Sequence, residues 1–423
     1  MNRTIKNIQV FVSTLKEGRK VVFLLFVFLF ALFGFEEARQ NQNGLAMVGG
    51  AKGKGLSNVE TPHIDYVAMS SDQYHKNLTE TIWYDDFSTK KLYMDSRGAL
   101  DTIVNFGVKG GSVNVGFNKG DVFGHGDRKV AFGDFPGNGP VIKQGQSFDE
   151  IYWRIYVKHE YGWNGSPAKM SRATSIVSDT WKQAMIAHVW NGGGPVLTLD
   201  PARGVYDQTD SIITTKYNDF DNLVWLGNSP TSQFPLTSTE ESGYWVLVES
   251  RVKLNTPGKN DGINQLWIDG ILEVERKNLN FRGNYTKHGI NAVFLESYWN
   301  KGSLKDQGRW YDNFVIATVP IGPVICPRNP TLVKTPYHGP GKLKNWEVEL
   351  ASDCNGAEKV FVSNNLGESS KIIVNTETGN FMGPLKGKSK LASGTIYFAR
   401  VRQQSSHGQW SVWSRWHQGF NVE

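Results

Sequence analysis

The alternating stretch 151–160 (IYWRIYVKHE) places basic and phenolic side chains next to one another, a combination that suits chemistry on an acidic sugar. Side chains alternate between the two faces of a β-strand, so the apolar residues of this stretch share one face. Arg154, Tyr156 and Lys158 share the other face. We therefore expect a strand that buries one face in a core and presents two cations and a phenol on the opposite face.

Two further segments carry groups of the same kind. The segment PAKMSR contains Lys169 and Arg172, and the strand-like stretch 183–190 (QAMIAHVW) has His188 and Trp190 on one side. His188 is a candidate catalyst. A histidine within an apolar strand is more often a structural residue, so a structural role is the alternative.

The longest regular pattern spans residues 243–282 and consists of two alternating strands joined by a loop rich in Gly, Pro and Asn. The second strand ends at Asp269-Gly270, a pair that predicts a hairpin with a type I′ turn when apolar alternations flank it. One face of the two strands is apolar and should enter a core. The polar face would carry Arg251, Lys253, Gln265 and Trp267.

If these segments pair in one sheet, their polar faces form a single groove. Aromatic faces stack on sugar rings, and arginine forks hold carboxylates. β-Elimination from a uronic acid needs a cation or amide to neutralise the carboxylate, a base to take the C5 proton, and an acid to protonate the leaving oxygen. The groove would offer candidates for all three roles and would be lined by Arg154, Tyr156, Lys158, His188, Trp190, Arg251, Lys253 and Trp267.

This arrangement predicts cleavage of an anionic, uronate-containing polysaccharide. We assign Lys169 or Arg154 to the substrate carboxylate, and His188 and Tyr156 to proton transfer. Two other interpretations remain: a protein of the same fold that binds carbohydrate or mediates adhesion without cleaving, and a structural surface protein whose basic strand faces are merely solvated. The residues predicted to contact substrate are Lys158, Arg172, Trp190, Arg251, Lys253, Gln265 and Trp267.

Other chemistries have weaker signatures. A glycoside hydrolase built on a β-sandwich needs paired carboxylates on one strand face. Here Glu273 and Glu275 follow a hairpin turn and indicate a solvated edge. The sequence has no zinc-type motif and no phosphate-binding loop. We expect no required cofactor, with a structural calcium ion conceivable at Asp85, Asp86 or Asp312.

Composition indicates an exported all-β protein with two domains. The 423 residues are enough for two cores, and abundant Gly and aromatic residues accompany few helical periodicities. The first 35 residues carry five Lys or Arg and one Glu, a net +4 out of the chain's +6, so the remainder carries only +2. A balance this close to neutral does not predict a nucleic-acid partner.

The order of composition along the chain predicts four segments. A basic stretch and the apolar run 21–35 make residues 1–35 a signal peptide, because 15 apolar residues fall short of the roughly 20 that span a bilayer; a retained membrane anchor is the alternative. Either way the protein should be secreted or held at the cell surface. Residues 36–60 form a flexible linker, 61–320 a jelly-roll domain, and 321–423 a smaller β-domain.

The last segment resembles a fibronectin type III domain, through YFARVR at 397–402 and WSVWS at 410–414. Arginines of one strand would lie between the indoles of the next, each gaining about 0.5–2 kcal/mol from cation–π contact. We expect this ladder to be structural rather than a binding surface. Cys326 and Cys354 are available to close a loop at the start of the domain.

Residues from about 80 to 320 resemble polysaccharide lyases with a concanavalin A-like jelly roll, nearest to the branch that acts on alginate or glucuronan. The similarity lies in RVKLNTPGK and WIDG within 251–270, in FR at 281–282, in FLESYW at 294–299 and in YDNF at 311–314. It implies an all-β jelly-roll sandwich and β-elimination of an anionic polysaccharide.

In that branch a catalytic lysine lies in a Gly-Lys-Leu-Pro segment, which the segment AKMS around Lys169 resembles. The next strands supply Ser-x-Arg and then Tyr-x-Tyr. Here the corresponding strand offers His188 but no arginine, and 197–199 (LTL) occupies the Tyr-x-Tyr position. The resemblance therefore leaves proton transfer to His188 or to another tyrosine, namely Tyr156, Tyr206 or Tyr217.

Overall fold

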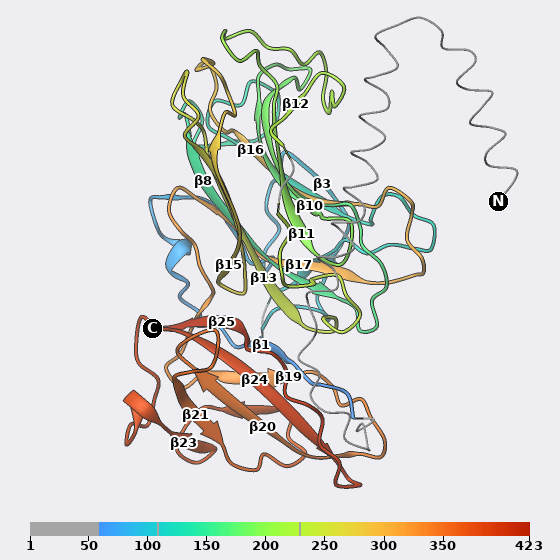
Figure 1. Ribbon diagram of the computed structural model, residues 1–423, viewed down its shortest axis with the longest axis vertical. Coiled ribbons are helices and arrows are strands. Elements are labelled where there is room, and N and C mark those ends of the chain that lie inside the picture. The colour runs from blue at the N-terminus through green and yellow to red at the C-terminus, as the bar shows by residue number, and fades with distance from the viewer. Residues whose placement is uncertain (1–58, 108–109, 228–229) are drawn as a thin grey trace, which may run out of the picture. The chain divides into compact units, whose positions relative to one another are not determined.

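The computed structural model describes residues 59–107, 110–227 and 230–423, all within the compact unit Ser57–Glu423 (Figure 1). The predicted signal peptide or anchor at 1–35 and nearly all of the predicted linker at 36–60 lie outside the described residues. In the part of the chain that is described, no helix is long and apolar enough to cross a membrane.

The described chain is built from β-strands, with two short 3-10 helices, η1 (Tyr74–Lys76) and η2 (Gly383–Leu385). Two eight-stranded sheets share one hydrophobic core, and we call them sheet I and sheet II (Figure 1). Sheet I has the order β15 (Ile271–Leu279), β14 (Gly262–Ile268), β13 (Trp245–Lys253), β8 (Glu150–His159), β17 (Arg309–Ala317), β5 (Ser112–Asn114), β4 (Leu100–Asp101), with β2 (Thr81–Asp85) on β17. Sheet II has the order β12 (Val224–Trp225), β11 (Leu197–Arg203), β10 (Gln183–Asn191), β9 (Lys169–Ile176), β16 (Ala292–Tyr298), β6 (Asp127–Phe132), β3 (Asp95–Arg97), with β7 (Val141–Ile142) parallel to β6.

Alternation along the central strands sets which residues enter this core. In β8, Trp153, Ile155 and Val157 point inward, and in β13 the even-numbered Val246 and Val248 do so. The turn between β14 and β15 has positive φ at both Asp269 (50°) and Gly270 (82°), as a type I′ turn requires. The predictions of an all-β fold with a jelly-roll sandwich, of the inward faces and of this hairpin are therefore confirmed.

A second sandwich is formed near the C-terminus. Its two sheets share a core in which Trp346, Val401 and Leu332 are fully buried. Strand β1 comes from the other end of the described chain, so the segment predicted to open the jelly-roll domain at residue 61 contributes to this sandwich instead. One sheet has the order β18 (Ile325–Cys326), β25 (His417–Val422), β24 (Ile396–Ser405), β20 (Leu343–Ala351), β21 (Lys359–Ser363), β23 (Gly379–Phe381), and the other β1 (Ile64–Val67), β19 (Thr331–Lys334), β22 (Lys371–Ile373).

The predicted arginine–tryptophan ladder is present on this sandwich. The Arg400 guanidinium lies 4.7 and 4.8 Å from the ring centroids of Trp413 and Trp416, and that of Arg402 lies 4.5 and 4.6 Å from those of Trp410 and Trp413. Each arginine also pairs with a carboxylate of β20. These contacts occupy both the arginines and the tryptophans of the ladder, in keeping with a structural role. The fibronectin type III-like topology itself stays a prediction.

The two cysteines do not close a loop in this structure. Cys326 is a buried free thiol, and Cys354 is a partly exposed one.

Candidate functional site

The prediction of one groove across all the basic strands is wrong, because those strands belong to two sheets. Strands β8, β13 and β14 lie in sheet I, whereas β9 and β10 pair with each other in sheet II. The sandwich core separates the two sheets, so their polar faces point to opposite sides. A repeat of two residues shows which side chains leave the core, but it does not show to which sheet a strand belongs.

Part of the polar face of sheet I is covered by the C-terminal sandwich. The ring of Tyr156 lies in the core of that sandwich together with Trp245 and Leu247. Its hydroxyl accepts a hydrogen bond of 3.0 Å from the Val324 backbone N–H, and burial raises the pKa of the phenol. Arg154 is 2% exposed and donates from Nη1 to the Gly322 carbonyl oxygen at 2.9 Å. Neither residue faces an open substrate groove.

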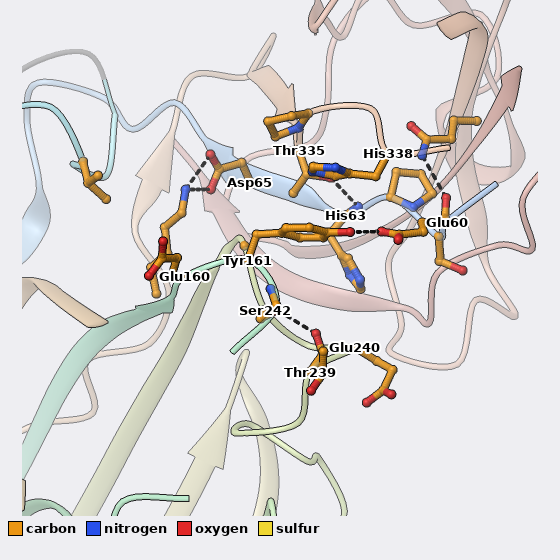
Figure 2. Close-up of a pocket in the computed structure, with 18 of the residues that line it drawn as sticks. Glu60, His63, Asp65, Glu160, Tyr161, Thr239, Glu240, Ser242, Thr335 and His338 are labelled. Atoms are coloured by element: carbon orange, nitrogen blue, oxygen red, sulfur yellow. Dashed lines mark hydrogen bonds and ion pairs between the residues drawn. The ribbon is translucent and has the colours of Figure 1, made fainter. Parts of the chain in front are cut away.

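A cavity of about 620 Å³ lies between the two sandwiches (Figure 2). Lys158 is one of its lining residues. Its ammonium is 2.7 and 2.9 Å from the two carboxylate oxygens of Asp65. Figure 2 shows the Tyr161 hydroxyl directed at Glu60, and the Tyr161 ring stacks on His338 with centroids 3.8 Å apart. The acidic side chains that line this cavity are Glu60, Asp65, Glu160 and Glu240.

Among the described residues that line the cavity, Lys158 is the only Lys or Arg, so four carboxylates outnumber one cation there. A polyanion would meet net repulsion there. This cavity is therefore a poor site for an acidic polysaccharide, although Lys158, a residue predicted to bind that substrate, lines it.

The remaining predicted contacts on sheet I belong to a network among themselves. Arg251 pairs with Glu150 at 2.6 Å and donates to Gln265 Oε1 at 2.8 Å, and Gln265 donates in turn to Glu275. The partly buried Trp267 packs beside this network, and Lys253 is exposed at the end of β13.

Sheet II presents an open groove of about 520 Å³ on its outer face. Strands β3, β6, β9 and β16 form the floor, and the loop at 217–220 forms one wall. The lining combines cations, carboxylates and four aromatic rings: Arg97, Phe123, Asp127, Lys129, Lys169, Tyr217, Asn218, Phe220, Glu296, Ser297 and Tyr298.

Lys169 differs from the other cations of this groove. Arg97 pairs with Asp127 at 2.6 Å, and Lys129 pairs with Asp95. Among the described residues, no carboxylate pairs with Lys169. Its Nζ instead lies 4.7, 5.3 and 5.6 Å from the ring centroids of Tyr298, Phe220 and Trp190. Burial lowers the pKa of Lys169; the charge of the nearby Glu296 carboxylate acts in the opposite direction, and Arg172 lowers the pKa further. A carboxylate brought into the groove would supply the missing partner.

Arg172 lies beneath the groove and positions Tyr217. It is fully buried, forms an ion pair with Glu296, and donates from Nη1 to Asn218 at 2.6 Å. Its Nη2 donates to the Tyr217 hydroxyl oxygen at 3.1 Å. Burial raises the pKa of Tyr217 to about 12, while the charge of Arg172 acts in the opposite direction. Arg172 therefore serves as a positioning residue, and the phenol faces the groove with a cation behind it.

His188 belongs to the same sheet but does not line the groove. Its ring is 0% exposed and lies 3.9 Å from the ring of Trp190 and 5.9 Å from that of Trp225. Nδ1 lies 2.8 Å from the Asp200 carbonyl oxygen, and Nε2 has no hydrogen-bond partner. Burial, aided by Arg172, lowers the pKa of His188 well below its usual value. The structure thus keeps His188 neutral beneath an aromatic cover.

Sequence reasoning missed several lining residues. Tyr298 and Glu296 lie within the FLESYW run, whose alternation does signal an outward-facing pair. Phe220 and Asn218 lie in a loop that has no periodicity, and Tyr217 stood only among alternatives.

The carboxylates considered for calcium are engaged by protein groups. Asp85 accepts from the Tyr93 hydroxyl and the Phe87 N–H, and Asp312 accepts from the Phe106 N–H. Across the described ranges, no group of three or more His, Cys, Asp or Glu side chains is placed to hold a metal ion. A structural calcium ion stays a prediction.

Comparison with known proteins finds no matching family model and no matching curated protein. The fold is similar to an alginate lyase from Chlorella virus at 15% identity and a TM-score of 0.37, covering 53% of this chain and 91% of that one. An endo-β-1,4-glucuronan lyase from the fungus Trichoderma reesei is similar at 13% identity and a TM-score of 0.35, covering 61% of this chain and 96% of that one. A marine alginate lyase from Aplysia kurodai is similar at 15% identity and a TM-score of 0.35, covering 56% of this chain and 99% of that one. At these values the similarity carries no functional argument, so function is argued from the groove itself.

Proposed function

We propose that the groove of sheet II binds an anionic, uronate-containing polysaccharide and cleaves it by β-elimination. The observation that carries the proposal is Lys169, an ammonium without a carboxylate partner among the described residues, held in an aromatic-lined groove beside a phenol. Aromatic faces suit sugar rings, and an unpaired cation in a partly desolvated site suits a uronate carboxylate.

In this proposal Lys169 contacts the substrate carboxylate and withdraws charge from it as the C5 proton leaves. Positive charge placed before the reaction stabilises the negative charge that develops on the enolate-like intermediate. Lys169 is the group assigned to this role because Arg154, the other candidate, is buried beneath the segment that leads into the C-terminal sandwich.

Tyr217, in its deprotonated form, takes the C5 proton of the uronate. The Arg172 guanidinium, which donates to the phenol oxygen, stabilises the phenolate. The electron pair of the C5–H bond then forms the C4–C5 double bond, and the bond from C4 to the glycosidic oxygen breaks. The leaving oxygen receives a proton from the groove, and the protonated phenol is the nearest acid in the arrangement proposed here.

Binding without cleavage is the second candidate function. The burial of His188 favours it, because that imidazole is shielded from any sugar in the groove. In this case Lys169 and the aromatic rings hold the polysaccharide, and no proton is moved.

The test is the ultraviolet absorbance of the unsaturated uronate product, measured with the full chain on alginate, glucuronan, pectate and glycosaminoglycans. Lys169→Ala should lower kcat by about 10²–10³-fold on the active substrate, as loss of a preorganised charge does. Lys253→Ala, a lysine exposed on sheet I, is the matched control and should leave kcat unchanged. Polysaccharide binding without product, abolished by Lys169→Ala, would establish the binding function. Cleavage that is unaffected by Lys169→Ala would overturn the proposed site.

A further inference from the structure

A small cavity lies where the jelly-roll sandwich meets the segment that leads into the C-terminal sandwich. Its volume is about 60 Å³, whereas one water molecule needs about 10–15 Å³ by the same measure. The lining contains one arginine and one histidine, and none of these described residues is Asp or Glu. The lining residues are Gln73, Tyr74, His75, Tyr84, Arg154, Ile321, Pro323, Ile325 and Asn421.

Arg154 gives this cavity a cation with an unused donor. The side chain is 2% exposed, and its Nε–H has no hydrogen-bond partner. No carboxylate of the described residues lies within ion-pair distance of its guanidinium. Glu249 is its cross-strand neighbour, but the two Glu249 oxygens accept the backbone N–H groups of Ile321 and Gly322 at 2.9 and 2.7 Å. Glu249 does not line the cavity.

His75 provides a second unused polar atom on the same cavity. The residue lies in η1 and is 7% exposed. Its Nε2 lies 3.0 Å from the Ile321 carbonyl oxygen and therefore carries the hydrogen, while Nδ1 has no partner. Buried polar atoms are almost always satisfied, so two unsatisfied atoms on residues that line one cavity point to a polar ligand.

We propose that this cavity binds the carboxylate group of a small organic acid at the Arg154 guanidinium. A planar carboxylate matches the geometry of a guanidinium edge. No Asp or Glu is among the described lining residues, so no lining carboxylate repels the bound one. Tyr74, which is 60% exposed, lies at the solvent side of the lining, so the remainder of a longer acid would extend towards it. This site lies on sheet I and is independent of the function proposed for the groove of sheet II.

Binding should be coupled to protonation of His75. The groups around the imidazole are Tyr74 of η1, whose ring centroid is 5.3 Å away, Arg154 of β8, Tyr84 of β2 and the carbonyl of Ile321, with Glu249 of β13 behind that segment. Burial and then the charge of Arg154 lower the pKa of His75 to about 4. A bound carboxylate offsets the charge of Arg154 and accepts a hydrogen bond from the protonated Nδ1–H, so the pKa of His75 rises and the acid binds more tightly as pH falls below neutral.

The experiment is thermal unfolding of the full chain in sodium acetate and in sodium chloride at equal ionic strength, with acetate affinity measured by calorimetry. Acetate should raise the transition temperature saturably relative to chloride. Arg154→Gln should weaken acetate binding at least about tenfold, since a hydrogen bond to a charged group is lost. Arg251→Gln, which alters an arginine of the same sheet outside the cavity, should retain the wild-type affinity.

Arg154→Lys keeps the charge and lacks the Nε–H, and it replaces Arg154→Gln if that variant does not fold; its affinity should fall similarly. His75→Gln should retain binding at neutral pH and lose its increase at lower pH. Equal transition temperatures in acetate and chloride would mean that water fills the cavity and would overturn the proposal. Undiminished acetate binding by both Arg154 variants would overturn it as well.

Discussion

The outer faces of sheets I and II have similar sequences and different surroundings. Strand β8 alternates Arg154, Tyr156 and Lys158 outward, and β9 and β10 present Lys169 and Trp190 in the same manner. On sheet I the C-terminal sandwich covers the tyrosine, and the segment that leads into that sandwich covers the arginine. On sheet II the lysine remains at an open groove. A local pattern thus shows which side chains leave a core, and the tertiary fold decides what they contact.

The pairing of Lys158, Arg251 and Lys169 follows the same division, whereas Arg154 is buried without an ion pair among the described residues. On sheet I, Lys158 pairs with Asp65 and Arg251 with Glu150. On sheet II, Lys169 is surrounded by aromatic rings and forms no ion pair with a carboxylate of the described residues, although Glu296 lines the same groove. A half-buried cation without an ion-pair partner at an open groove is costly, which is why we place polysaccharide binding on sheet II.

The largest effect is expected from removing the phenol of the open face. Tyr217→Phe should reduce kcat by about 10²–10⁴-fold, because the proton-transfer group is lost while the ring remains. The rate of ultraviolet product formation measures it. Tyr206→Phe is the matched control, since Tyr206 is 59% exposed and lies outside the groove, and it should retain full activity. Equal rates for both variants and the wild-type chain would remove Tyr217 from the mechanism.

The pH profile gives the next test of the open face. The active form has Lys169 charged and Tyr217 ionised, although the pKa of Lys169 is lowered and that of Tyr217 is raised to about 12. With the lysine pKa below the tyrosine pKa, kcat/KM should rise with pH up to the lysine pKa and then level off. Lys169→Arg keeps its charge at that pH, so its rate should continue to rise towards the tyrosine pKa. A profile for Lys169→Arg with the same break as the wild type would show that Lys169 does not set it.

The covered face should respond in stability rather than in rate. Tyr156→Phe leaves the Val324 N–H without its acceptor and should lower the free energy of unfolding by about 1–3 kcal/mol. Denaturant unfolding measures this loss, and kcat should be unchanged in the folded variant. A large fall in kcat with wild-type stability would return Tyr156 to a catalytic role.

Much of the fold was predictable because short-range rules determine it. Alternation identified the inward faces of β8 and β13, and Asp269-Gly270 identified a turn with two positive φ angles. Lys169 was predictable as a candidate from its segment. The grouping of the strands into two sheets was not, because long-range pairing leaves no mark in a repeat of two residues. The place of Tyr217 in the groove was not predictable either, because it depends on the path of a loop and on the hydrogen bond from Arg172.

Hydrogen–deuterium exchange of the full chain, with and without a uronate oligosaccharide, tests the central claim most directly. The oligosaccharide should slow amide exchange in the segments around Lys169, Tyr217 and Tyr298, and it should leave those around Arg251 and Trp267 unchanged. Protection confined to the Arg251 and Trp267 segments, with none at the groove of sheet II, would contradict the account.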